Sequence, residues 1–96
     1  MNQEELDLIK GVFTSAEAKD ILLCLIDNKI KFHNEKIFSD KERFGFDCTE
    51  SVNRISELRK TRERIIEILA KSAIAGNDVS IHSQIVIESL IKEEAV

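Results

Sequence analysis

The chain of 96 residues contains no proline, no tryptophan and no tyrosine, and it has only three glycines and two cysteines. Proline breaks a helix from inside, so its absence allows long uninterrupted helices. Without Trp or Tyr the chain lacks the broad aromatic surfaces on which many proteins stack bases or sugars. These absences favour a few long regular elements and argue against a platform for nucleic acid or carbohydrate.

Charge and hydropathy narrow the possible classes of protein further. The net charge is −4, which disfavours general binding to the phosphate backbone of nucleic acids. The longest apolar run, Ile21–Ile26, is far too short to span a bilayer. The first residues, Met1–Glu5, have neither the basic nor the apolar region of a signal peptide. The sequence therefore predicts a single cytoplasmic domain, near the lower end of what one core can stabilise.

The two cysteines are expected to remain reduced. Cys24 lies in the middle of the first predicted helix and Cys48 opens the second. In an antiparallel hairpin they would stand roughly 15–20 Å apart, given the helical rise per residue. A disulfide needs a much closer approach. Cys24, at the boundary of an apolar arc, is expected to react slowly with thiol reagents, and Cys48, at a helix N-terminus, faster.

Start and stop signals define the elements. Thr14–Glu17 forms a capping box, in which a Thr oxygen accepts from an early helical N–H and the Glu reaches back. Gly76, followed by Asn77, marks a helix end, since glycine tolerates positive φ. Further capping signals are Ser39–Glu42, with Gly45 after it, and Asp47–Glu50. The sequence predicts helices over about 15–38 and 48–75, joined by a capped one-turn connector at 40–44.

In the C-terminal segment the apolar residues recur every second position instead of with the spacing of a helix. β-Branched residues alternate with polar ones from Val79, which predicts a strand over about 79–91, with a helix from Gln84 as the alternative. The candidate partners of this strand are the short run Glu5–Phe13, broken by Gly11, and the same strand of a second copy. The second copy is favoured, because the first helix also has an apolar arc too broad for one neighbour to cover. The residues expected at that dimer interface are Leu23, Ile30, Ile81, Ile85 and Ile87.

Candidate chemistry centres on cations close to apolar positions. Arg59 and Arg62 fall within the apolar stripe of the second helix, at the levels of Lys29 and Ile26 in the hairpin. Converging cations require an anion. It could be a small dianionic ligand bound by Lys29, His33, Arg59 and Arg62, or an acidic side chain. The acids considered are Glu4, Glu5, Asp7 and Glu88. Alternatively, both Arg heads extend into water while their stems cover the core.

Two other kinds of site have less support. No pair of cysteines or histidines has the spacing of a metal site, so neither a metal nor a cofactor is expected. The basic run Arg59–Arg64 could contact nucleic acid. However, its cations point to different sides of the helix and are balanced by nearby acids, so a solvated face is favoured. His33 is expected to reach water, or a neighbouring chain, at the edge of the apolar arc.

Two resemblances add context. Lys29–His33, Ile37–Ser39 and Glu42–Gly45 together resemble a group of small uncharacterised bacterial proteins with a helical hairpin. That resemblance covers most of the chain and implies a bacterial cytosolic protein, with no activity to transfer. Over Leu22–Lys29 the chain also resembles the first helix of small all-helical chorismate mutases, which bind a dicarboxylate among Arg and Lys side chains. A third long helix is missing here, so no catalytic residue is carried over.

The sequence thus predicts a mainly α protein, an antiparallel two-helix hairpin with a C-terminal β-strand completed by a second copy. The expected function is that of a non-enzymatic self-associating or partner-binding module. One alternative is a small-anion-binding helical enzyme that uses the clustered Lys and Arg side chains. The other is a nucleic-acid accessory protein.

Overall fold

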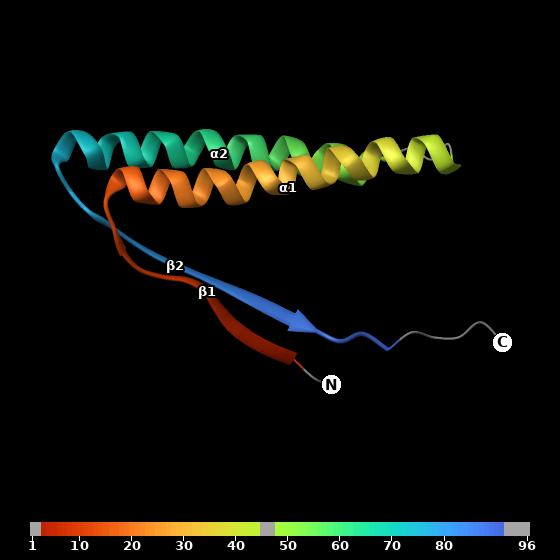
Figure 1. The fold of residues 1–96 in the computed structure, drawn as a ribbon, viewed down its shortest axis with the longest axis horizontal. Helices are drawn as coiled ribbons and strands as arrows, with labels where there is room; N and C mark the ends of the chain where they lie inside the picture. Colours follow the sequence, from red (N-terminus) through yellow and green to blue (C-terminus); the bar gives the residue numbers. More distant parts are fainter. Residues whose placement is uncertain (1–2, 45–47, 92–96) are drawn as a thin grey trace.

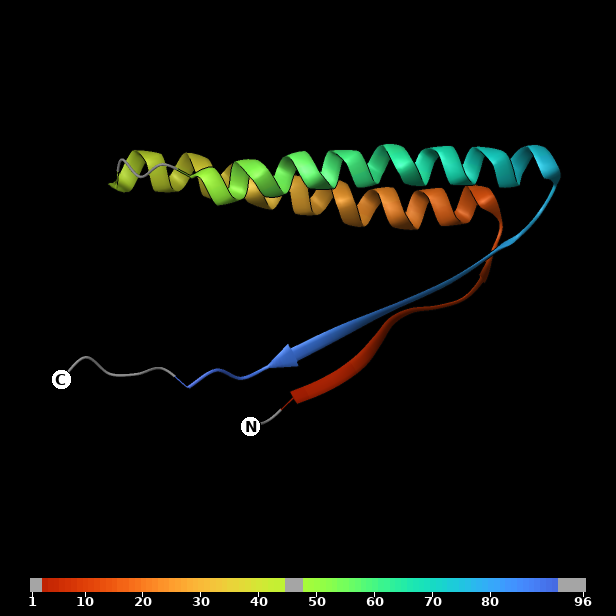
Figure 2. The same cartoon turned by 180° about the vertical axis from the view of Figure 1, so that it is seen from behind.

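Two helices and two strands make up the computed structural model, which describes residues 3–44 and 48–91. In chain order they are β1 (Gln3–Phe13), α1 (Ser15–Phe44), α2 (Thr49–Ala75) and β2 (Val79–Glu88). The helices pack side by side as an antiparallel hairpin, and the strands form an antiparallel ribbon that leaves the hairpin at one end (Figure 1). Seen from behind, the ribbon and the hairpin diverge from that common end like the arms of a V (Figure 2).

The common end is fixed by local hydrogen bonds. The predicted capping box is confirmed, because Thr14 N donates to Glu17 Oε1 at 3.0 Å and Glu17 N donates to Thr14 Oγ1 at 3.1 Å. Hydrogen bonding to the Glu17 carboxylate lowers its pKa below the usual value; the backbone N–H of Thr14 is the main cause and the Thr14 side chain the second. The hydroxyl of Ser15 donates to the carbonyl of Asn77 at 3.3 Å. The start of α1 is therefore tied to the turn that follows α2.

Gly76 ends α2 as the sequence predicts. Its φ of 71° lies in the left-handed region. Its N–H donates to Ala73 O, and the N–H of Asn77 donates to Ser72 O, which satisfies carbonyls that the helix end would otherwise leave unpaired. The chain can then reverse directly into β2.

The far end of the hairpin differs from the prediction. Helix α1 does not stop at Phe38 but continues to Phe44, so the capping signal at Ser39–Glu42 does not start a separate turn. Lys, Glu and Arg in this stretch are good helix formers, and neither glycine nor proline forces a break before Gly45. The predicted capping signals at Gly45 and Asp47 fall on residues outside the described part of the chain. Cys48 is the N-cap of α2 and makes no side-chain capping bond.

The N-terminal run also differs from the prediction, because it supplies a full partner for β2 within the same chain. β1 pairs antiparallel with β2 from Gln3↔Glu88 to Phe13↔Val79. The expectation that β2 lacks a convincing partner in its own chain was wrong, and β2 ends at Glu88 rather than at residue 91. The fold is a helical hairpin with a two-stranded ribbon, and the predicted mainly α hairpin stands.

Little of the molecule is buried. Among the described residues the buried apolar side chains are Ile9, Ala18, Ile26, Ile55, Leu58 and Leu69. The Cα atoms extend over 60 × 34 × 14 Å with a radius of gyration of 17.6 Å. A compact chain of about 100 residues has a radius of gyration of roughly 13 Å. The protomer is therefore flat, open and poorly covered.

Replacing Gly76 with Ala is expected to lower the free energy of unfolding by about 1 kcal/mol, because an L-residue is strained in the left-handed region. The added Cβ would meet no atom within 4 Å, so the loss is purely conformational. Gly11→Ala is the control, since its Cβ would make only an ordinary contact of 3.4 Å with the Phe13 ring. Urea denaturation measures both variants. Equal stability of Gly76→Ala and wild type would contradict the left-handed cap.

Candidate functional site

One face of the ribbon is apolar. Residues directly opposite each other in an antiparallel pair lie on the same face, and the register places Leu6 opposite Ile85 and Gly11 opposite Ile81. A bulge between Asp7 and Ile9 leaves Leu8 without a paired residue and restores the alternation, so that Ile9 joins this face opposite Ser83. We call this surface the apolar face; its large apolar side chains are Leu6, Ile9, Phe13, Val79, Ile81, Ile85 and Ile87. One charged residue, Glu4, lies on it at the outer end, opposite Ile87.

The apolar face is covered only near the closed end of the V, where the ribbon joins the helical hairpin. Ile9 is 8% exposed, and Ala18 at the start of α1 is fully buried. Further out the ribbon loses this cover, and Leu6 and Ile87 are 50% and 55% exposed. The ribbon packs against α1, and no other described element covers its outer half. Exposed apolar strips of this kind are typical of interaction surfaces in soluble proteins.

Helix α1 carries exposed apolar side chains of its own. Leu25 and Phe32 follow the buried Ala18 at intervals of two helical turns, so all three lie on one side of the helix. Leu25 and Phe32, together with Asn28, Lys29 and His33, line an open hollow of about 500 Å³. The rings of Phe32 and His33 meet edge to face, with centroids 5.3 Å apart. Both arms of the V thus present uncovered apolar groups.

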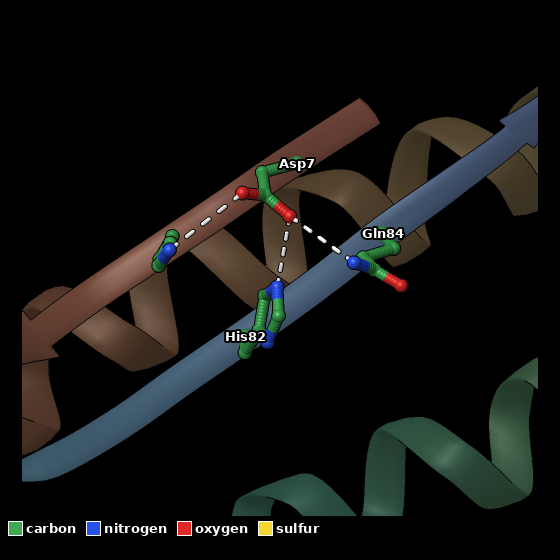
Figure 3. A network of polar contacts seen from close by, with 4 residues as sticks. Asp7, His82 and Gln84 are labelled. Atoms are coloured by element: carbon green, nitrogen blue, oxygen red, sulfur yellow. Dashed lines mark hydrogen bonds and ion pairs between the residues drawn. The ribbon is translucent and has the colours of Figure 1, made fainter. Parts of the chain in front are cut away.

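The opposite face of the ribbon carries a polar network around Asp7, together with the exposed Val12 and Val86. His82 Nε2 lies 2.9 Å from Asp7 Oδ1, and Gln84 donates to the same oxygen at 3.4 Å (Figure 3). Lys10 Nζ is 3.9 Å from Asp7 Oδ2. The hydrogen bond with His82, and then that with Gln84, lowers the pKa of Asp7 below its usual value. This network links the two strands, and all its members are well exposed.

The structure places the predicted anion-binding residues in different surroundings. Lys29 and His33 share the hollow beside Phe32. Arg59 lines a separate hollow between α1 and α2, together with Asn34 and Lys60. Binding of an anion by these side chains stays a prediction, and the structure does not bring them to one hollow.

Arg62 has a partner that the sequence reasoning missed. Its Nε donates to Asp27 Oδ1 at 2.9 Å, and its terminal nitrogen lies 3.5 Å from Asp27 Oδ2. The partner is an acid on α1 rather than Glu4, Glu5, Asp7 or Glu88. The predicted hairpin register had placed Arg62 level with Ile26, one residue away, so a search of the neighbouring positions would have found it.

The predicted interface residues occupy two parts of the molecule. Leu23 and Ile30 are half-buried on α1, and Ile81 is half-buried on the apolar face. Ile85 and Ile87 are exposed at its outer end. The polar pair Asp7 and His82 was not recognised from sequence, because the bulge at Leu8 hides the pairing of β1 with β2.

His33 combines partial burial with an unsatisfied polar atom. Its Nδ1 is buried and has no hydrogen-bond partner within the described part of the chain. In the same part of the chain no three His, Cys, Asp or Glu side chains are placed to hold a metal ion. Nor does either helix combine the length and apolar character needed to cross a bilayer over the residues described.

Comparisons with family models, with curated proteins and with solved structures found no match to this chain. The assignment of a function therefore depends on the surfaces described above.

Replacing Asp7 with Asn should destabilise the ribbon at neutral pH. Because folding lowers the pKa of Asp7, its ionised form stabilises the fold above the unfolded pKa, near 3.8, and this contribution is lost as the pH falls through the lower folded value. The stability difference between wild type and Asp7→Asn is expected to shrink below about pH 3.8. Glu5→Gln, on the same face of β1, is the control. A difference that stays constant from pH 7 to pH 2 would contradict the role of the carboxylate.

The cysteines have the opposite exposures to those expected. Cys24 is exposed, whereas Cys48 is half-buried and its Sγ donates to Ile37 O at 3.8 Å. Cys24 should therefore react first with a thiol reagent under native conditions, because access limits the reaction. Mass spectrometry after brief labelling, with Cys24→Ser and Cys48→Ser as references, measures the order. Faster labelling of Cys48 would show that its helix N-terminal position outweighs burial.

Proposed function

We propose that the protein is a self-associating module that acts by binding rather than by catalysis, with a homodimer as its working form. One observation carries the proposal: the outer half of the apolar face, including Leu6, Ile85 and Ile87, is exposed in the protomer. Burying such side chains is worth about 25 cal/mol per Å² of apolar surface, so an unpartnered protomer forgoes much of its available stabilisation.

The ribbon itself supports this proposal. A two-stranded sheet is only marginally stable in water unless it packs on something or gains further strands. Here it contacts α1 near the closed end and diverges from it further out (Figure 1). A second copy would supply both the missing strands and the missing apolar cover.

The alternatives have weaker support. An anion-binding enzyme needs its cations together, but Arg62 is already paired with Asp27, and Arg59 lines a different hollow from Lys29. A nucleic-acid accessory role would use Arg59–Arg64, yet Arg64 is paired with Glu67 and the net charge is −4. A different protein could bind the same apolar face, and the expected cytoplasmic location suits either kind of partner.

Light scattering at micromolar concentration is expected to give twice the mass of the chain. Leu6→Lys should shift the mass toward the monomer, because a buried unpaired charge at an interface is strongly unfavourable. Ile87→Lys should shift it less, since Glu4 lies directly opposite position 87 and pairs with the new charge. Both side chains are half exposed in the protomer, so folding itself should tolerate the changes.

Glu5→Lys is the matched control: it places the same charge on the polar face of the same strand and should leave the mass unchanged. Circular dichroism checks that each variant keeps its helices. A wild-type monomer with a cooperative melt would refute the proposal. Equal loss of association in Glu5→Lys would show that charge, and not the apolar face, controls assembly.

A further inference from the structure

The two outer edges of the ribbon differ in their ability to accept another strand. β1 carries Glu4, Glu5, Asp7 and Lys10 and is interrupted by the bulge at Leu8. Charges and bulges are features by which edge strands resist pairing. From Val79 to Ile87, β2 has no Asp, Glu, Lys, Arg or proline, and no bulged residue. Its outer edge is bonded to no strand in the described part of the chain.

We propose that a second copy of this chain pairs antiparallel with the outer edge of β2, strand β2 to strand β2, about a two-fold axis at Gln84. The resulting sheet has four strands in the order β1-β2-β2-β1, with the charged, bulged β1 at both outer edges. The inference rests on the proposed self-association and specifies its interface. A two-fold axis makes the same edge serve both partners, so the interface closes.

Side-chain alternation restricts the register. The apolar faces of the two copies lie on the same side of the four-stranded sheet only if odd-numbered residues stand opposite odd-numbered ones and even-numbered residues opposite even-numbered ones. An axis at Gln84 satisfies this, and it places Ile81 opposite Ile87 of the second copy and Ser83 opposite Ile85. The apolar strip then continues across the interface, in the region where it is exposed in the protomer.

Several registers meet this condition, and the positions of the charged residues distinguish between them. An axis at Ser83 would place Asp78 opposite Glu88 of the second copy, and like charges directly opposite each other destabilise a sheet. An axis at Ile85 would set Ile81 against Ser89 and shorten the overlap of the two strands. With the axis at Gln84, Glu88 stands opposite Ser80, and Ser80–Glu88 of one copy pairs with the same segment of the other.

Single-cysteine cross-linking tests both edge and register. In a background with Cys24→Ser and Cys48→Ser, one cysteine is introduced at a time by His82→Cys, Ser83→Cys, Gln84→Cys, Ile85→Cys or Val86→Cys. With a strand rise of roughly 3.3 Å and a strand spacing of about 4.8 Å, positions 83 and 85 lie roughly 8 Å from their own mates. That separation is beyond disulfide range.

Gln84→Cys is therefore expected to give nearly complete dimer bands on a non-reducing gel, Ser83→Cys and Ile85→Cys little, and His82→Cys and Val86→Cys none. Glu5→Cys on β1 is the control for the other edge and should give none. Since Gln84→Cys removes the bond to Asp7, the double variant Ser83→Cys/Ile85→Cys provides a second test and should also cross-link between copies.

The outcomes separate the two proposals. A dimeric mass without cross-links at positions 82–86 would overturn edge pairing through β2 and leave self-association standing. Strongest cross-linking at Glu5→Cys would overturn the choice of edge, and a maximum at 83 or 85 would overturn the register. A monomer at every concentration would remove both this inference and the proposed function.

Discussion

The arrangement of the whole chain depends on how the closed end of the V is fixed. There the capping box at Thr14 sets the direction in which the chain enters α1, and the left-handed Gly76 sets the direction in which it leaves α2. The bond from Ser15 to Asn77 holds these two points together. Because both strands leave the hairpin at the same place, they run side by side, and their pairing follows from this junction.

The same junction leaves the molecule open. The strands begin close to α1 but diverge from it, so burial is concentrated at Ile9 and Ala18 and declines toward Leu6 and Ile87. Within the hairpin, Ile55, Leu58 and Leu69 of α2 are buried, while Val52 nearer the other end is 52% exposed. A chain that distributes its apolar residues in this way is stabilised along two narrow contact regions rather than by one central core, and it leaves much apolar surface for the proposed second copy to cover.

Sequence reasoning succeeded where the signal is local. Thr14, Glu17 and Gly76 each act on neighbouring backbone groups, so their roles can be predicted without knowledge of the fold. It failed at Ser39, because the residues after Ser39 suit a new helix start and a continuing helix equally well. It also failed for the ribbon, where pairing joins the two ends of the chain and the alternation of β1 is hidden by the extra residue Leu8. Asp27 was missed because its partner Arg62 lies on the other helix, although the predicted register came within one residue.

The pairing of β1 with β2 has a consequence for the order in which the protein can fold. β1 precedes both helices and β2 follows them, so the ribbon closes a loop that contains both helices. Such non-local pairing costs loop-closure entropy, which is lower once the hairpin has brought the two strands together. During synthesis β1 therefore has no partner until both helices and β2 have been made. The charges and the bulge on β1 suit a strand that must remain unpaired in water without aggregating, whereas β2 can pair with β1 as soon as it is made.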